Sequence, residues 1–158
     1  SVVSSTGALI LCADHDNNAS GTFTMASGAS LSATTTVTLD ASGAMTLYAI
    51  TNSGANNITI GTNRKPSSVT ISGVISNSTT TGNTCTIYSN GNITRAANIG
   101  STTRAFTNVY LYTDFDNTGS ATCSSTGGTV YASTAVYLMA KAATALTMTG
   151  TFTINTGR

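Results

Sequence analysis

The sequence lacks glutamate, glutamine and tryptophan, and its 158 residues include only one proline and one histidine. Six basic and five acidic side chains give a net charge of +1. General acid–base catalysis depends mainly on His, Glu and Asp, so this composition excludes most enzyme classes, and we expect no catalytic activity and no cofactor. A phosphate-binding surface needs clustered Lys and Arg, so the composition also argues against nucleic acid as a partner.

Long apolar runs are also missing. The longest covers residues 8–13 and is too short to cross a membrane, so we expect no membrane span. What is abundant is small and polar: 33 Thr, 20 Ser and 14 Asn. An apolar content of 40% at low net charge still predicts a folded chain with a core.

Apolar and polar residues alternate with a period of two through most of the chain. Such alternation runs through residues 36–39, 45–50, 58–60, 69–71 and 109–112, and it predicts strands with one buried face. Residues 135–140 are consistent with a helical turn or a buried strand, and flanking Thr favours the strand. Turn-forming Asn, Asp, Ser and Gly separate these segments. The pattern predicts an all-β fold, an antiparallel β-sandwich or jelly roll of about nine to eleven strands.

The amino-terminal segment differs from the rest. Its most apolar stretch consists of Gly7, Ala8, Leu9, Ile10, Leu11, Cys12 and Ala13, and a polar linker follows at once. Such a strand either folds back into its own domain or leaves to complete the sheet of a neighbouring subunit. We therefore divide the chain into residues 1–20, a separable donor strand with its linker, and residues 21–158, the β domain.

Two Asp-x-Asp pairs are the only acidic clusters. Asp14 with Asp16 and Asp114 with Asp116 offer oxygen ligands suited to Ca²⁺, but Asp and Asn also cap turns, and no Glu completes an EF-hand loop. We favour the turn and assign no metal site. His15, between Asp14 and Asp16, is interpreted as a solvated loop residue.

Tyr110 and Tyr112 share one face of an expected strand. Such a pair stacks on a sugar or a base, or packs against cross-strand neighbours. The sequence leaves both readings open.

The three cysteines and four glycosylation sequons point to the outside of a cell. We expect a disulfide between Cys85 and Cys123, with Cys12 either a buried free thiol or an intermolecular bridge. The sequons place candidate N-linked glycans on Asn18, Asn57, Asn77 and Asn92. The sequence begins at Ser1, and we expect that a secretory signal peptide has been removed.

Taken together, these residues resemble a family. A processed amino terminus, the short apolar strand at residues 7–13, the polar linker and a charge-poor Thr/Ser/Asn-rich β domain with sequons look like the subunits of archaeal bundling pili and threads. They are similar also to bacterial biofilm-matrix fibre subunits. The resemblance implies a homopolymer in which the amino-terminal strand of one subunit completes the β-sandwich of the next, forming an extracellular filament for adhesion or biofilm.

Two other functions fit the same composition. One is a secreted carbohydrate-binding or adhesin β-sandwich module, calcium-dependent through Asp114 and Asp116. The other is a β-sandwich of a viral capsid or tail.

Overall fold

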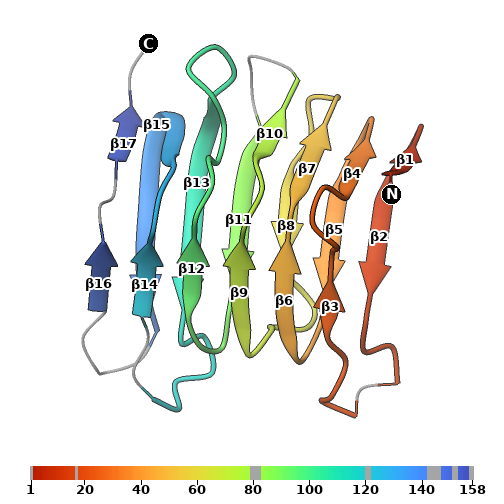
Figure 1. The fold of residues 1–158 in the computed structure, drawn as a ribbon, viewed down its shortest axis with the longest axis vertical. Helices are drawn as coiled ribbons and strands as arrows, with labels where there is room; N and C mark the ends of the chain where they lie inside the picture. Colours follow the sequence, from red (N-terminus) through yellow and green to blue (C-terminus); the bar gives the residue numbers. More distant parts are fainter. Residues whose placement is uncertain are drawn as a thin grey trace.

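The computed structural model describes residues 2–16, 18–78, 83–119, 122–141, 147–150 and 153–156. Within these residues the chain forms strands and turns and no helix, so none that is long and apolar enough to cross a membrane. Every strand pairing described is parallel. Successive strands along the chain therefore belong to different sheets (Figure 1).

Three sheets contain all of these strands. The first sheet consists of β1 (Val2–Ser5), β4 (Ser30–Ala33), β7 (Ala49–Asn52) and β10 (Ile75–Asn77). The second consists of β2 (Leu9–Cys12), β5 (Val37–Asp40), β8 (Ile58–Ile60), β11 (Thr84–Tyr88), β13 (Phe106–Thr113), β15 (Thr129–Ala140) and β17 (Thr153–Thr156). The third consists of β3 (Phe23–Thr24), β6 (Ala44–Leu47), β9 (Ser68–Ile71), β12 (Ile93–Arg95), β14 (Thr122–Ser125) and β16 (Thr147–Gly150).

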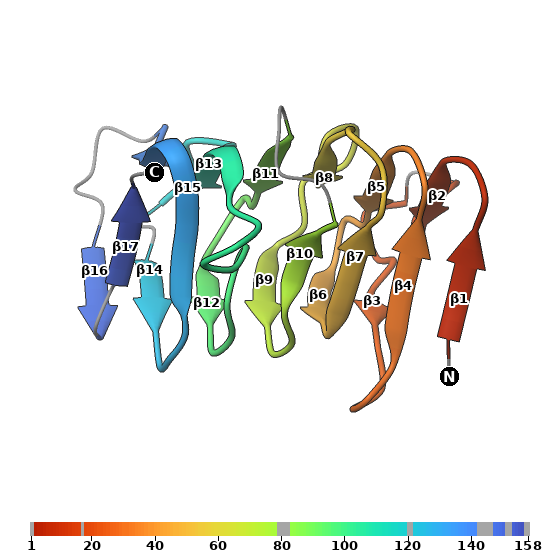
Figure 2. The same cartoon turned by 90° about the horizontal axis from the view of Figure 1, so that it is seen from above.

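From β1 to β12 the chain passes in turn through the first, second and third sheets, and each strand lies beside its counterpart of the previous coil (Figure 2). Two isolated parallel bridges continue the line of the first sheet beyond β10, from Ile75 to Ile99 and from Ile99 to Val130 in β15. The long β15 thus begins in the line of the first sheet and ends in the second, where it pairs with β13. This architecture is a β-solenoid, in which each coil contacts only its neighbours.

The core is a set of columns running along the solenoid axis. In the second sheet, Val37, Ile58, Cys85 and Val109 occupy one in-register column, and all four are buried. Each fully buried aliphatic side chain contributes about 1.5–3 kcal/mol relative to an exposed one. The columns therefore stabilise the stack along its whole length.

The outward residues between these columns are mostly hydroxyl-bearing. In the third sheet Thr24, Thr46, Thr70, Thr94 and Ser124 form one continuous outer column. Within it, the Ser124 hydroxyl donates to Thr94 Oγ1 at 3.0 Å. The abundant Thr and Ser thus cover the outside of the rod.

The structure confirms an all-β chain with alternating burial and corrects its arrangement. The antiparallel β-sandwich or jelly roll was wrong, because all strand pairs described are parallel, and the predicted nine to eleven strands were too few, because many strands have only two to four residues. Alternation reports that one strand face is buried, which is equally true of a solenoid wall. The expected strand at residues 135–140 is confirmed as part of β15.

Side-chain amides of asparagine connect adjacent coils at the corners. The Oδ1 atoms of Asn57, Asn92 and Asn98 accept hydrogen bonds from Thr84 N, Thr122 N and Thr129 N at 2.9, 2.9 and 2.7 Å. Each donor is the first residue of a strand one coil further on. These bonds satisfy a backbone N–H just where the ladder begins, which fixes the register of the new coil.

Arg95 is a fully buried charged residue at the end of β12. Its Nη1 donates to the carbonyls of Ala97 and Gly127 at 3.2 and 2.8 Å, and its Nη2 donates to Ser125 Oγ at 2.8 Å. Burial lowers the pKa of Arg95 below its ordinary value. The guanidinium joins the turn of its own coil to that of the next.

The amino-terminal segment is part of the same solenoid. Strand β1 pairs with β4, β2 with β5 and β3 with β6, so residues 2–24 supply the first coil. The first coil lies at one end of the row of strands, and β16 and β17 lie at the other (Figure 1).

Removal of one whole coil tests this architecture. Deleting residues 58–84 brings Cys85 into the position of Ile58, because these two residues occupy the same register position. We expect a shorter solenoid that still unfolds cooperatively in urea, with an m-value reduced roughly in proportion to the surface lost.

Deletion of residues 58–71 is the matched control, because it removes β8 and β9 and so only part of a coil. Strands β7 and β10, both of the first sheet, would then follow each other without the strands that connect them. This variant should lose its β-sheet circular dichroism. Equal behaviour of the two variants would contradict the solenoid.

Candidate functional site

Five aromatic side chains gather at one end of the outer face of the second sheet. They are Tyr88 in β11, Tyr110 and Tyr112 in β13, Phe115 directly after β13, and Tyr137 in β15. Parallel in-register pairing places Tyr88 opposite Tyr112 and Tyr110 opposite Tyr137. We call this group the aromatic platform.

The rings of the aromatic platform stack along the solenoid axis. Tyr110 and Tyr137 have ring centroids 4.7 Å apart at 5°, and Tyr88 and Tyr112 have centroids 4.8 Å apart at 13°. These separations match the spacing of neighbouring strands, about 4.8 Å, so the backbone ladder imposes the stacking. Phe115 meets Tyr88 and Tyr112 edge-on, at 5.2 and 6.1 Å.

Both lysines of the chain approach this aromatic platform. Lys65 Nζ lies 5.0 Å from the Phe115 ring centroid and 5.8 Å from that of Tyr88. Lys141 Nζ lies 4.7 Å from the Phe115 centroid. Lys65 also donates to the Thr62 carbonyl at 2.7 Å, which holds its ammonium at the edge of the rings. The aromatic platform therefore carries positive charge at one end.

Partial burial, followed by the neighbouring Tyr88 and Tyr110, raises the pKa of Tyr112 above its ordinary value. The phenol is therefore a neutral donor and acceptor in the physiological range. Of the expected roles for Tyr110 and Tyr112, cross-strand packing is confirmed by their stacked partners.

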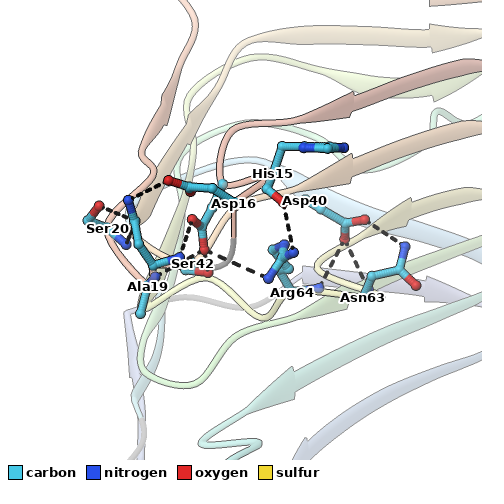
Figure 3. Close-up of polar contacts among 10 residues, drawn as sticks. His15, Asp16, Ala19, Ser20, Asp40, Ser42, Asn63 and Arg64 are labelled. Atoms are coloured by element: carbon cyan, nitrogen blue, oxygen red, sulfur yellow. Dashed lines mark hydrogen bonds and ion pairs between the residues drawn. The ribbon is translucent and has the colours of Figure 1, made fainter.

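A polar cluster, separate from the aromatic platform, connects the first three coils at the corner between the second and third sheets (Figure 3). Asp14 Oδ1 accepts from Asn18 N at 3.1 Å, and its Oδ2 accepts from Ala19 N at 3.3 Å and from the Ser42 hydroxyl. Arg64 Nη1 lies 3.9 Å from the same Oδ2. The Ser42 bond above all lowers the pKa of Asp14 below its ordinary value, against an opposing effect of burial.

Asp40 continues this cluster in the next coil. Its Oδ2 accepts from Asn63 Nδ2 at 2.8 Å and its Oδ1 from Asn63 N at 3.1 Å (Figure 3). Asp40 is a lone acid at the end of a strand, so the sequence around it does not indicate a polar cluster. Its position directly before a turn was the one available signal.

The acid pairs considered for calcium are turn residues in the structure. Asp114 Oδ1 accepts from Thr118 N and Gly119 N at 3.2 and 3.3 Å, as Asp14 accepts from residues four and five further on. The two Asp-x-Asp loops thus have the same local design at the same corner of different coils. Among the residues described, no three His, Cys, Asp or Glu side chains come together as metal ligands would.

The other predicted residues fall in several places. His15 is exposed, and its carbonyl accepts from Arg64 Nη2 at 3.4 Å. All three cysteines are free, so the expected Cys85–Cys123 bridge is not formed in this structure. Burial raises the pKa of Cys85 to about 12 and that of Cys123 to about 11, which keeps both as unreactive thiols. Cys12 is exposed rather than buried, which removes the buried-thiol reading.

The four sequon asparagines differ in accessibility. Asn18, Asn57 and Asn92 are exposed, and Asn77 is buried at the end of β10, where its Nδ2 faces the Ala105 carbonyl at 3.5 Å. A glycan on Asn77 would have to displace that side chain from the interior. Asn57 and Asn92 have the corner role described above.

The predicted donor segment contains β2, whose partner is β5 of the same chain. Leu9 is buried, Leu11 is half-buried, and Ile10 points outward with 66% exposure. Val3 points inward beside Leu31 yet is 45% exposed, and it lines a cavity of ≈ 320 Å³ with Leu11 and Phe23. The apolar interior is therefore accessible at the first coil.

Comparisons with protein-family models, curated proteins and solved structures return no match for this chain. Its function must therefore be inferred from its own geometry.

Acid titration tests the cluster around Asp14. Because its folded pKa is lowered, the carboxylate stabilises the fold above its ordinary pKa of 3.8, and this stabilisation is lost as the pH falls through the folded value. In Asp14→Asn, the difference in unfolding free energy from the parent should be largest near pH 7 and should vanish in strong acid.

Ser42→Ala removes the strongest bond to the carboxylate, so its acid-unfolding midpoint should move to higher pH than that of the parent. Ser32→Ala deletes a hydroxyl that bonds only to Ser4 Oγ at 3.0 Å and serves as the control. A constant gap between Asp14→Asn and the parent from pH 7 to pH 2 would show that the Asp14 charge does not act in this way.

Proposed function

We propose that this chain is a structural, non-catalytic segment of an extracellular filament, and that its copies join end to end by coil stacking. The observation that carries the proposal is the open first coil. Within the residues described, β1, β2 and β3 each pair on one side only. An unpaired strand edge above an exposed apolar interior is a template for another strand.

The side chains at this edge favour association. Val2 is 73% exposed and Ile10 66%, and the inward Val3 remains 45% exposed. Strands β1, β2 and β3 contain no Lys, Arg or Pro, the residues by which many proteins block an open edge. Covering these residues with another coil would bury apolar surface at about 25 cal/mol per Å².

The occupant we propose is the last coil of a second copy. At the opposite end of the row of strands, β16 pairs with β14 and β17 with β15, and neither has a second partner among the described residues. Ile154 in β17 is 45% exposed there. Joining unlike ends is a head-to-tail contact, and such contacts generate open filaments rather than closed rings when the rotation does not close.

This proposal keeps the expected filament and changes its mechanism. Insertion of one donor strand into a β-sandwich groove has no counterpart in a parallel solenoid. Instead, β2 and β3 would continue the neighbour's second and third sheets beyond β17 and β16, and β1 would follow the line of its first sheet. The net charge of +1 offers little repulsion between copies, and the Thr and Ser columns supply a hydroxyl surface whose hydration does not depend on pH.

An edge-blocking substitution tests the proposal. Leu9 N donates to the Thr36 carbonyl at 2.9 Å and Ala13 N to the Asp40 carbonyl at 2.9 Å. Alternate residues of a parallel strand bond to the same neighbour, so the N–H of Ile10 faces the open edge. Ile10→Pro therefore removes an edge donor and no internal hydrogen bond.

We expect the parent to form filaments one solenoid wide by negative-stain microscopy, and Ile10→Pro to remain monomeric by light scattering. Its unfolding free energy should stay within about 1 kcal/mol of the parent. Ile10→Thr retains the N–H and is the control, with filaments that form but dissociate more readily. Filaments of Ile10→Pro, or a parent that stays monomeric at high concentration, would rule out joining through this edge.

A further inference from the structure

We propose that the aromatic platform with Lys65 and Lys141 is a binding site for an acidic polysaccharide, a polymer of uronate type that lies along the solenoid axis. This site goes beyond the proposed filament function and does not depend on it, because every residue involved belongs to one chain and lies on the side of the rod rather than at its ends.

The aromatic platform offers the contacts that sugars use. Tyr137 is 42% exposed, and the other four rings are half-buried, so the edges of the stack face solvent. Among the residues described, no hydrogen bond involves the hydroxyls of Tyr88, Tyr110, Tyr112 or Tyr137, which leaves them available as donors and acceptors. An apolar body with a polar tip is the combination that recognises the alternating C–H and O–H groups of a sugar ring.

A column of hydroxyls extends this surface along the rod. Thr38, Thr59, Thr86, Tyr110 and Tyr137 occupy successive in-register positions on the outer face of the second sheet. Their spacing is that of the strands, about 4.8 Å. A periodic row of hydroxyls suits a periodic polymer better than it suits a single small molecule.

Charge selects the acidic class of polymer. Lys65 and Lys141 both lie within cation–π distance of Phe115, and neither forms an ion pair with a described carboxylate. Two acids flank Phe115. Asp114 is buried and its Oδ1 accepts from Thr118 N and Gly119 N, whereas Asp116 is exposed and its Oδ1 accepts from Thr118 Oγ1 at 2.9 Å. Because Asp114 is buried in its turn, two ammonium groups and only one exposed carboxylate reach solvent beside Phe115, and this surface complements spaced carboxylates.

Nucleic acid fits the same surface less well. Bases bind to single-strand platforms by stacking on free aromatic faces, and here one face of Tyr110 is covered by Tyr137 and one face of Tyr112 by Tyr88. A phosphate backbone also needs more positive charge than two lysines provide. The covered ring faces and limited charge thus favour hydroxyl and carboxylate contacts over base stacking.

Binding of polygalacturonate to the full chain tests the inference, with carboxyl-reduced polygalacturonate as a neutral polymer of the same backbone and oligothymidylate as the nucleic-acid probe. We expect the acidic polymer to bind, with an affinity that falls as salt rises from 50 to 500 mM. Over this range the Debye length shrinks to about a half or less, so the attraction between charges is screened more strongly. The neutral polymer should bind about tenfold more weakly, the difference made by one good charged contact.

Matched variants locate the site. Lys65→Gln combined with Lys141→Gln should lower affinity about tenfold and remove most of the salt dependence, whereas Arg104→Gln, a charge loss at an exposed position before β13, should not. Tyr110→Phe with Tyr137→Phe keeps the rings and removes the hydroxyls, so it should weaken both polymers without loss of the fold. Asp116→Asn should strengthen binding of the acidic polymer only.

Each remaining outcome overturns the inference. Equal affinity for the acidic and neutral polymers would exclude the lysines as the selecting groups. Oligothymidylate binding as tight as polygalacturonate binding would make this a nucleic-acid surface. Absence of binding by folded monomer, checked by circular dichroism, would reject the site, and none of these outcomes bears on Ile10→Pro or on filament formation.

Discussion

The in-register parallel ladder between successive coils is the constraint on which the rest of this structure depends. It places each residue about 4.8 Å above its counterpart in the previous coil. A buried position therefore becomes a buried column, as with Val37, Ile58 and Cys85, and an outer position becomes an outer column, as with Thr46 and Thr70. The stacking of Tyr110 on Tyr137 follows from the same repeat, since their strands fix the ring separation. Side chains of one chemical type on the surface of this fold are thus arranged in columns parallel to the solenoid axis.

The side chains at the corners fix the strand register, which the flat walls alone do not. A parallel sheet with similar residues in every strand can slip by two residues, because this slip keeps the same face buried, whereas a slip of one residue would turn the apolar side chains outward. Asn57, Asn92 and Asn98 prevent this at three corners, each by accepting the first N–H of a strand one coil further on. Arg95 adds a buried link between turns, and breaking it would remove the shorter of two hydrogen bonds to the Gly127 carbonyl, which also accepts from Ser125 Oγ at 3.2 Å. Polar side chains at the corners therefore fix the register, whereas apolar side chains in the walls form the core.

Strand content and burial were predictable from the sequence, and the topology was not. Alternation placed Tyr110 and Tyr112 on one strand face, and in the structure Val109 and Leu111 on the opposite face are buried; this was predictable because the period of two is local. Strand pairing is not local, and the sequence signal for it was a repeat of similar residues at a fixed spacing. Twenty-four residues separate Met45 from Val69, Val69 from Ile93, and Cys85 from Val109, and each pair is in register. Coils of other lengths interrupt this period, such as Val37 to Ile58, which hides it. The lysines of the aromatic platform were unpredictable for the same reason, since Lys65 and Phe115 meet only across coils.

The uses proposed for the side and for the ends of the rod have, in combination, a consequence that neither has alone. A polymer that binds along the second sheet contacts one aromatic platform in each copy of the chain. If copies join through β1, β2 and β3 of the first coil, these aromatic platforms repeat along the filament at the length of one chain. Weak contacts at each site then act together, because once one site is bound the next binds at a high effective concentration. A surface with only two lysines per chain can in this way hold an acidic polymer firmly, which is what adhesion by a charge-poor fibre would require.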